Sequence, residues 1–358
     1  VELRDQPVVE RLRIQISKAR NAIEETRSAI AEARGATHLP ELYVRLAELL
    51  SEEARYHYQI AYEREQSGKS LHVPQVRFLK EKAISFYELL LARYSTSPLI
   101  PRVLFNKGQE HRELGQYDKM RATLLKLVEE HPTASLRQDA LLILGDDQFD
   151  RNNLTLAGEY YRKIVEGPLS RLTGLAHYKL AWVFVNQAEC KPALAEFENA
   201  IKRTKGWYEG AMVNSTGAQT ATQTDLDVRR EALVDLVYCF TQERKAPEAV
   251  PFLRSLAYRR GAYVAALEKL AVRFGTMDQA EGAIQVGREL LLLGPDSEQR
   301  IDDARLLHAA LIKAKEYGRV GEDTALMAEA VLRQVRKPGL PSEERERLIT
   351  ELEQYVRD

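Results

Sequence analysis

The sequence has few cysteines and no excess of charge of one sign. Its 358 residues include two cysteines, Cys190 and Cys239, too few for a disulfide framework and without the paired spacing of a zinc site. The sequence alone does not tell whether these thiols are free. Lys and Arg number 52 against 53 Asp and Glu, so no net field attracts a polyanion such as DNA. We therefore expect no nucleic-acid partner.

Long apolar runs are absent as well. No run approaches the ~20 residues of a membrane-spanning helix, so any membrane association is expected to be peripheral, through partners or through an N-terminal anchor outside this chain. The chain begins at Val1 rather than Met, and we expect any targeting segment to have been removed or left out.

Signatures of catalysis are also lacking. The seven histidines include no pair at the i, i+4 spacing of a helical metal site, and the sequence has no G-x-S-x-G, P-loop or G-x-G-x-x-G motif. Its densest acidic cluster, Asp146, Asp147 and Asp150, is interpreted as exposed helix charge rather than as catalytic carboxylates or a cation site. We expect a chain without catalysis, cofactor or metal.

What the sequence does contain is a repeat. With Pro101 as position 1, apolar, small and helix-breaking residues recur at the sites Leu104, Gly108, Tyr117, Met120, Leu124, Leu127 and Pro132. Small residues let two antiparallel helices approach closely, large apolar residues fill the seam between them, and a terminal proline ends the second helix. Four further frames begin at Gln138, Gly174, Arg230 and Val264. Five frames in register predict an all-α, right-handed solenoid of antiparallel helix pairs.

These frames resemble the tetratricopeptide repeat (TPR) family over roughly residues 40–336. The resemblance implies that positions 2, 5, 9, 12 and 13 of each frame lie on a concave face that binds partner segments. We take the following residues as candidate partner-binding side chains: Phe105, Arg112, Asp139, Asp146, Phe149, Asp150, Tyr178, Trp182 and Tyr238. Their aromatic rings and carboxylates would suit an extended or helical segment with aromatic, apolar and basic side chains. The alternative that some rings serve helix packing stays open.

The domain organisation follows the repeat. We expect an N-terminal heptad-patterned helix in residues 1–36, repeats in 37–204 with a degenerate first one, and an inserted loop in 205–228. Further repeats and capping helices follow in 229–336, and a loosely held charged helix or tail in 337–358. Trp207 and Tyr208 in the loop either form an exposed contact pair or anchor its root.

The N-terminal segment has apolar residues at spacings of three and four from Val9 to Ala33. This seam predicts a coiled-coil-like helix, which either packs on the first repeat or pairs with a second copy of the chain. Arg13, Arg20, Arg27 and Arg34 form a basic stripe beside the seam. We interpret the stripe as a solvated face in preference to a site for an acidic partner.

The repeats resemble those of bacterial envelope members of the family, such as the BamD assembly lipoprotein and the CpoB envelope coordinator. The long first helices resemble those of larger envelope or gliding-motility scaffolds. That likeness implies a non-catalytic scaffold that binds proteins or peptide segments of a periplasmic envelope complex. A cytoplasmic location is the alternative. Two other functions remain open: an oligomerisation or spacer module acting through residues 1–36, and the accessory solenoid of an envelope hydrolase.

Overall fold

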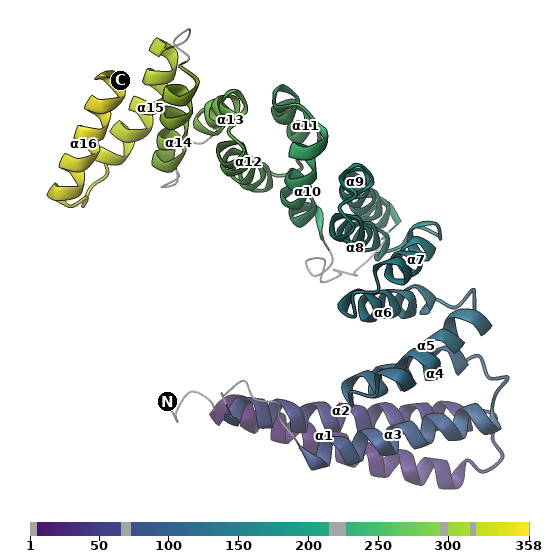
Figure 1. Ribbon diagram of the computed structural model, residues 1–358. Coiled ribbons are helices and arrows are strands. Elements are labelled where there is room, and N and C mark those ends of the chain that lie inside the picture. Colours follow the sequence, from purple (N-terminus) through teal and green to yellow (C-terminus); the bar gives the residue numbers. More distant parts are fainter. Residues whose placement is uncertain (1–5, 66–72, 215–226, 294–299, 316–319, 358) are drawn as a thin grey trace. The chain divides into compact units, whose positions relative to one another are not determined.

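The computed structural model describes residues 6–65, 73–214, 227–293, 300–315 and 320–357 (Figure 1). These residues form 16 α-helices and one 3-10 helix, and none of them lies in a strand. The chain divides into two compact units, residues 1–144 and 145–358, whose boundary falls inside α6 (Arg137–Asp150). The all-α fold predicted from the frames is confirmed.

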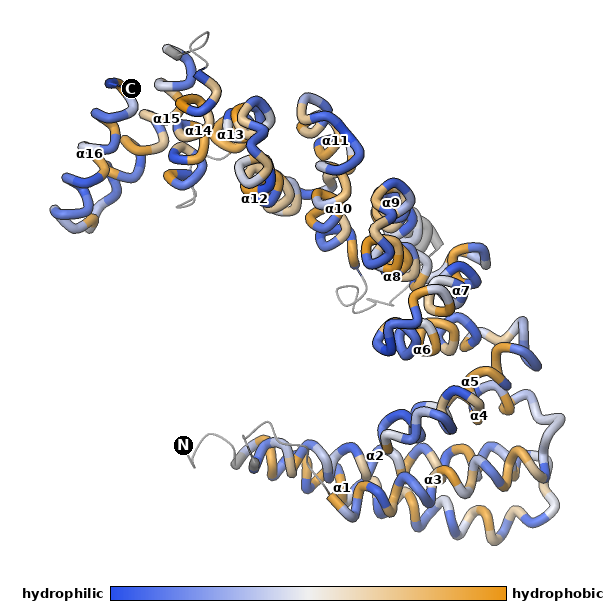
Figure 2. The backbone as a smooth tube through the Cα atoms, in the orientation of Figure 1, coloured by the Kyte–Doolittle hydropathy of each residue, from blue (hydrophilic) through white to orange (hydrophobic). Residues whose placement is uncertain are grey.

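Hydrophobic and hydrophilic positions alternate along the helices in Figure 2, as in helices that bury one face. None of the described helices has the length and apolar character to cross a membrane.

The N-terminal helix packs on its own chain. Helix α2 (Leu39–Glu65) contacts both α1 (Gln6–Glu32) and α3 (Pro74–Arg93) within the first unit. Ile16, Ala19 and Ile23 of the seam are buried, and Ile23 belongs to one hydrophobic cluster with Leu46 and Tyr87. Of the two arrangements that the sequence left open, the structure shows packing on the first helix pair. The oligomerisation alternative stays a prediction, with Ile16, Ala19 and Ile23 covered within the chain.

Five helix pairs follow at the positions of the five frames. They are α4 (Ile100–Glu113) with α5 (Tyr117–Glu130), α6 with α7 (Leu154–Val165), α8 (Thr173–Asn186) with α9 (Cys190–Asn214), α10 (Arg229–Glu243) with α11 (Ala249–Leu256), and α12 (Arg260–Thr276) with α13 (Ala280–Leu293). The expected close approach of paired helices is present. A Cβ added to Gly108 would lie 2.6 Å from Leu124 Cδ2, and one added to Gly145 would lie 2.5 Å from Tyr161 Cε1.

The turn between paired helices has the same backbone conformation in four of the five frames. Gly115, Asn152, Ala188 and Asp278, each at position 15 of its frame, have positive φ angles of 71°, 59°, 61° and 62°. In each case the next residue donates its N–H to a carbonyl five positions earlier, as Gln116 does to His111 at 2.8 Å. This left-handed cap satisfies carbonyls that the end of a helix would otherwise leave unpaired.

The fourth frame departs from this turn. Arg244, at its position 15, is extended with φ −128°, and the chain continues through the 3-10 helix η1 (Ala246–Glu248). Pro247 lies in η1, and the α11 helix that follows is short at 8 residues.

The predicted start of the inserted loop, at residue 205, was wrong. Helix α9 continues to Asn214, so residues 205–214, which we predicted as loop, are helical. The chain has no proline between Pro192 and Pro247, and the helix-weakening Gly206 costs only about 1 kcal/mol, so the helix is not broken there. Trp207 is half-buried. The side chain of Tyr208 and residues 215–226 of the loop lie outside what the structure describes.

At the C-terminal end, α14 (Arg300–Ala314) and α15 (Val320–Val335) form the expected capping helices. The seam of α15 is formed by the buried Met327, Ala330 and Val331, whereas Ala325 is exposed.

The last helix, α16 (Ser342–Arg357), is not loosely held as we expected. It contacts α15, and its Leu348 and Tyr355 are buried. Arg305 of α14 donates to both carboxylate oxygens of Glu351 at 2.9 Å. Leu348, Leu352 and Tyr355 share one face at spacings of four and three, and that face gives the charged helix an apolar side to bury.

The two cysteines form a disulfide. Cys190 begins α9 and Cys239 lies in α10, with their Cα atoms 4.8 Å apart and both residues buried. The bond joins the second helix of one pair to the first helix of the next, across 49 positions of sequence.

Candidate functional site

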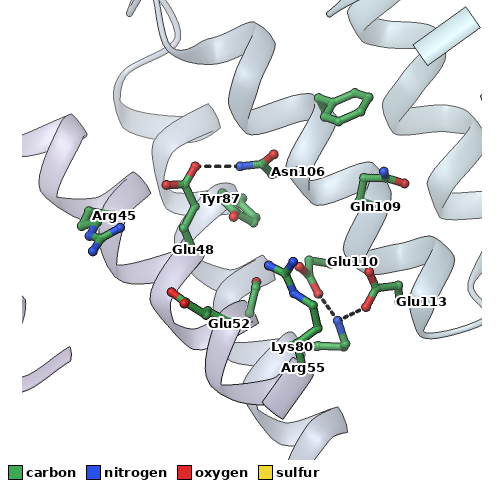
Figure 3. A pocket seen from close by; sticks show the side chains of 12 residues that line it. Arg45, Glu48, Glu52, Arg55, Lys80, Tyr87, Asn106, Gln109, Glu110 and Glu113 are labelled. Atoms are coloured by element: carbon green, nitrogen blue, oxygen red, sulfur yellow. Dashed lines mark hydrogen bonds and ion pairs between the residues drawn. The ribbon is translucent and has the colours of Figure 1, made fainter. Parts of the chain in front are cut away.

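A polar pocket of the first unit lies between α2 and α4, and two residues of α3 also line it (Figure 3). It is a pocket of about 430 Å³ lined by Arg45, Glu48, Ser51, Glu52, Arg55, Lys80, Tyr87, Phe105, Asn106, Gln109, Glu110 and Glu113. Seven of these side chains are charged at neutral pH. The pocket is therefore suited to a polar ligand segment rather than to a purely apolar one.

Helix periodicity explains why these residues meet. Arg45, Glu48, Glu52 and Arg55 are spaced three, four and three residues apart along α2, which places them on one face. Phe105, Gln109 and Glu113 are four residues apart along α4 and occupy positions 5, 9 and 13 of the first frame. Three of the five positions that the family resemblance assigned to a concave face thus line one pocket.

A buried lysine organises the floor. Lys80 Nζ of α3 donates to Glu110 Oε2 at 2.7 Å and also pairs with Glu113. The side chains of Lys80 and Glu110 are only 5% and 8% exposed, and charges so buried persist only when they are paired. This triad joins α3 to α4, and two of the three N–H donors of Lys80 are used within the chain.

A second set of contacts joins α2 to α4. Asn106 Nδ2 donates to Glu48 Oε1 at 3.0 Å, and Arg102 approaches the same oxygen at 2.6 Å. Tyr87 is almost fully buried beneath them, and burial raises its pKa above the usual range, so it remains a neutral phenol. Glu52 accepts a hydrogen bond from Tyr56 at 2.6 Å. Most carboxylates of the pocket are therefore held by partners within the chain.

The remaining donors point to ligand binding. Among the described residues, Arg45 and Arg55 form no ion pair, and Gln109 forms no hydrogen bond through its side chain; Figure 3 shows all three around the cavity. A guanidinium binds carboxylates through two parallel N–H donors, and a side-chain amide can both donate to and accept from a peptide group. These three side chains thus have the donors that a carboxylate and a peptide group would need.

The structure distributes the predicted binding residues unequally. Phe105 is half-buried and lines the pocket, whereas Arg112 is exposed on α4 outside it. Asp139 is half-buried in α6. In the second unit, Phe149 is half-buried and Asp150 is exposed.

Several predicted side chains of the second unit connect neighbouring first helices. Asp146 accepts from Tyr161 Oη at 2.7 Å and pairs with Lys179 Nζ at 3.2 Å. Tyr178 Oη donates to Asp235 Oδ2 at 2.7 Å, and the other oxygen of Asp235 accepts from Lys269 Nζ at 2.9 Å. These bonds link α6, α8, α10 and α12 in turn.

Some of the candidate aromatic side chains pack against other residues of the chain. Tyr178 and Trp182 both contact the buried ring of Phe197, with ring centroids 5.8 and 6.1 Å away. Tyr238 is 43% exposed, and the Arg273 guanidinium lies over its ring at 4.6 Å. Of the three rings, Tyr238 offers the most surface to a partner.

Sequence reasoning missed the α2 side of the pocket. The concave positions were derived from the well-formed frames and were not extended to the degenerate first pair, so Arg45, Glu48 and Arg55 were overlooked. The signal was present as charged residues at helical spacing along α2, but a solvated helix face has the same pattern.

Comparison with known proteins identifies the repeat. A tetratricopeptide repeat family profile matches residues 102–134, which are α4, α5 and the turn between them. The chain therefore contains a tetratricopeptide repeat at these residues. No curated protein sequence matches it significantly. The matched repeat contributes Phe105, Gln109 and Glu113 to the pocket.

Several solved structures are similar to the chain at low identity. The crystal structure of MamA is 18% identical over 60% of this chain and 99% of its own, with a TM-score of 0.35. The C-terminal part of a TPR repeat-containing protein from Cytophaga hutchinsonii is 17% identical over 82% and 98%, with a TM-score of 0.41. The structure of Naa15/Naa10 bound to HypK-THB is 15% identical over 94% of this chain and 45% of that one, with a TM-score of 0.42.

Proposed function

We propose that this chain is a non-catalytic scaffold whose pocket between α2 and α4 binds a segment of a partner protein. Tetratricopeptide repeats are protein-interaction modules, and extended concave surfaces are what solenoids of this kind use for binding. The observation that carries the proposal is the pocket itself, where three concave positions of the matched repeat face a charged stripe of α2.

The pocket favours a particular partner chemistry. Arg45 and Arg55 would bind a carboxylate of the partner, Gln109 would bind its peptide backbone, and Phe105 would contact an apolar side chain. The Lys80 triad would act as a rigid base, because an already paired buried cluster need not reorganise when a ligand arrives.

We propose a second contact surface in the other unit, formed by Phe149, Trp182 and Tyr238. Trp182 serves packing against Phe197 as well, so its contribution to binding is expected to be smaller than that of the more exposed Tyr238.

We further propose that the scaffold belongs to an envelope complex in the bacterial periplasm. The disulfide between Cys190 and Cys239 supports this location, because such bonds persist in oxidising compartments and are rare in the cytosol. Cell fractionation and thiol alkylation of the protein in intact cells test the proposal. Recovery of the chain in the cytosol with both cysteines alkylated would contradict it.

The binding proposal is tested by crosslinking and affinity capture from native membranes and periplasm. We expect Arg45→Ala/Arg55→Ala to lose partners that the unmodified chain captures stoichiometrically. The matched control is Arg27→Ala/Arg34→Ala, which removes the same charge from exposed positions of the N-terminal segment outside the pocket. Circular dichroism verifies that each variant is folded.

A parallel Phe149→Ala/Trp182→Ala/Tyr238→Ala variant tests the second surface. Partners lost in the arginine variant but retained in this one place recognition in the first unit. A partner list unchanged in both variants contradicts both proposed surfaces.

A further inference from the structure

A second groove lies between α1 and α2, the two long helices that run beside each other in Figure 1. It has a volume of about 490 Å³ and is lined by Arg13, Ile16, Ser17, Arg20, Asn21, His57, Ile60 and Arg64. None of these residues lines the polar pocket described above. On α2, the 100° turn per residue places His57, Ile60 and Arg64 on the opposite side from Glu48 and Glu52. The groove is therefore a separate surface.

The groove combines an apolar floor with a basic rim. Ile16 and Ile60 contribute aliphatic surface, while Arg13, Arg20 and Arg64 are exposed. Glu53 is the acidic group nearest to the rim; its side chain is 5% exposed, accepts from Arg20 Nε at 2.7 Å and lies 3.4 Å from His57 Nε2. Glu10 approaches Arg13 at 3.5 Å, with both side chains more than half exposed. These carboxylates neutralise only part of the rim.

The positive charge extends along α1. Between Pro7 and Asn21 the helix carries four basic residues, Arg11, Arg13, Lys18 and Arg20, against the single acidic Glu10. A second copy of this helix would bring like charges together in the groove, so self-association through it is disfavoured. The charge pattern instead favours an acidic occupant.

We propose that this groove binds an amphipathic α-helix of a partner protein whose polar face is acidic. Two neighbouring helices leave a linear furrow into which a third can pack, and apolar side chains at spacings of three and four would meet Ile16 and Ile60. Carboxylates flanking those side chains would pair with Arg13 and Arg64. Arg20 holds the buried Glu53 and so keeps the groove in shape.

The test uses the full chain and a fluorescein-labelled peptide about three heptads long, with leucine at the a and d positions and glutamate elsewhere. Fluorescence anisotropy should show saturable binding that weakens with ionic strength. Arg13→Glu/Arg64→Glu is expected to weaken binding about tenfold. The matched control Arg11→Glu/Arg34→Glu changes the net charge equally, and Arg11 faces away from Arg13 around α1, so binding should stay within about twofold.

Three further measurements separate the alternatives. A peptide of the same composition with scrambled leucines, and one with lysine in place of glutamate, should not bind. Equal weakening in the two arginine variants would overturn the proposal in favour of nonspecific charge attraction. Failure of the glutamate peptide to bind the folded chain would overturn it too, as would preferential binding to phosphatidylglycerol vesicles. Because Arg45 and Arg55 are intact in every variant, these results do not affect the proposal for the polar pocket.

Discussion

Asp303 of α14 is a carboxyl group whose surroundings disfavour its charge. Burial, followed by the nearby charges of Glu268 and Asp302, raises its pKa to about 7, and Arg300 offsets part of this effect. Glu268 Oε1 is itself buried without a hydrogen-bond partner among the described residues, and burial raises the pKa of Glu268. Two acidic groups therefore meet at the contact of α12 and α14.

This arrangement predicts a pH dependence of stability. An Asp303 pKa raised from 3.8 means that the folded state holds a proton that the unfolded state releases, so stability falls as pH rises toward 7 and levels off above it. Asp303→Asn should raise the melting temperature clearly more at pH 8 than at pH 5, where only part of the destabilisation is present. Thermal melts at several pH values check this, with Asp118→Asn as the control, because the side chain of Asp118 in α5 is 97% exposed. An equal effect of Asp303→Asn at both pH values would contradict it.

Gly145 illustrates how little space separates paired helices. A Cβ at this position would lie 2.5 Å from the ring of Tyr161, which is fully buried and held by its bond to Asp146. Gly145→Ala should destabilise the chain by about 1–3 kcal/mol, because the ring cannot move aside. Gly275→Ala in α12 is the control: no atom lies within 4 Å of the added Cβ, so a gain of up to about 1 kcal/mol is expected. Calorimetric melts compare the two.

At the scale of elements, the turn after each first helix is the most regular feature of the repeat. Glycine, asparagine or aspartate occupies position 15 in three of the four frames with the left-handed turn, and these residue types enter that region most easily. Ala188 is the exception, with φ 61°. Its side chain makes the turn between α8 and α9 conformationally strained.

Ala188→Gly is therefore expected to stabilise the second unit by about 1 kcal/mol, since glycine removes the steric cost of a left-handed Cβ. Gly115→Ala, at the equivalent position between α4 and α5, should destabilise the chain by a similar amount. Melting temperatures of the two variants check the pair. Opposite signs support the explanation, and a destabilised Ala188→Gly would contradict it.

For the molecule as a whole, the disulfide makes the stability of the folded chain depend on the redox state of its surroundings. Cys190 and Cys239 close a chain segment of 49 positions that includes the end of α9 and the residues before α10. A cross-link of this length restricts the unfolded chain, and its removal typically costs about 2–4 kcal/mol.

Reduction, or the Cys190→Ala/Cys239→Ala variant, should accordingly lower the melting temperature of the oxidised chain. The variant should be insensitive to reductant, which serves as the control for nonspecific effects. Differential scanning calorimetry with and without reductant measures both. An unchanged melting temperature on reduction would show that helix packing alone holds α9 and α10 together.

How well a feature of this structure can be predicted depends on how far apart along the chain its contacting residues lie. Helix boundaries, the small residues at position 8 and the buried N-terminal seam depend on neighbours within one or two turns, so spacing along the chain predicts them. The same local reasoning was wrong for residues 205–214, where no proline interrupts α9. It was also wrong for α16, which packs against α15 in spite of its polar composition. Phe105 lines the pocket, and the binding role of every candidate residue stays a prediction.

The sequence by itself determined the all-α class, the positions of the five helix pairs and the resemblance of their frames to tetratricopeptide repeats, because each depends on periodicity. Only the tertiary structure decided that α1 packs on α2, that Cys190 pairs with Cys239, and that Lys80 bridges Glu110 and Glu113. These contacts join residues about 30 or more positions apart on different helices. Whether such residues meet depends on how each helix is rotated about its axis and crosses its neighbours, which spacing along one helix does not specify.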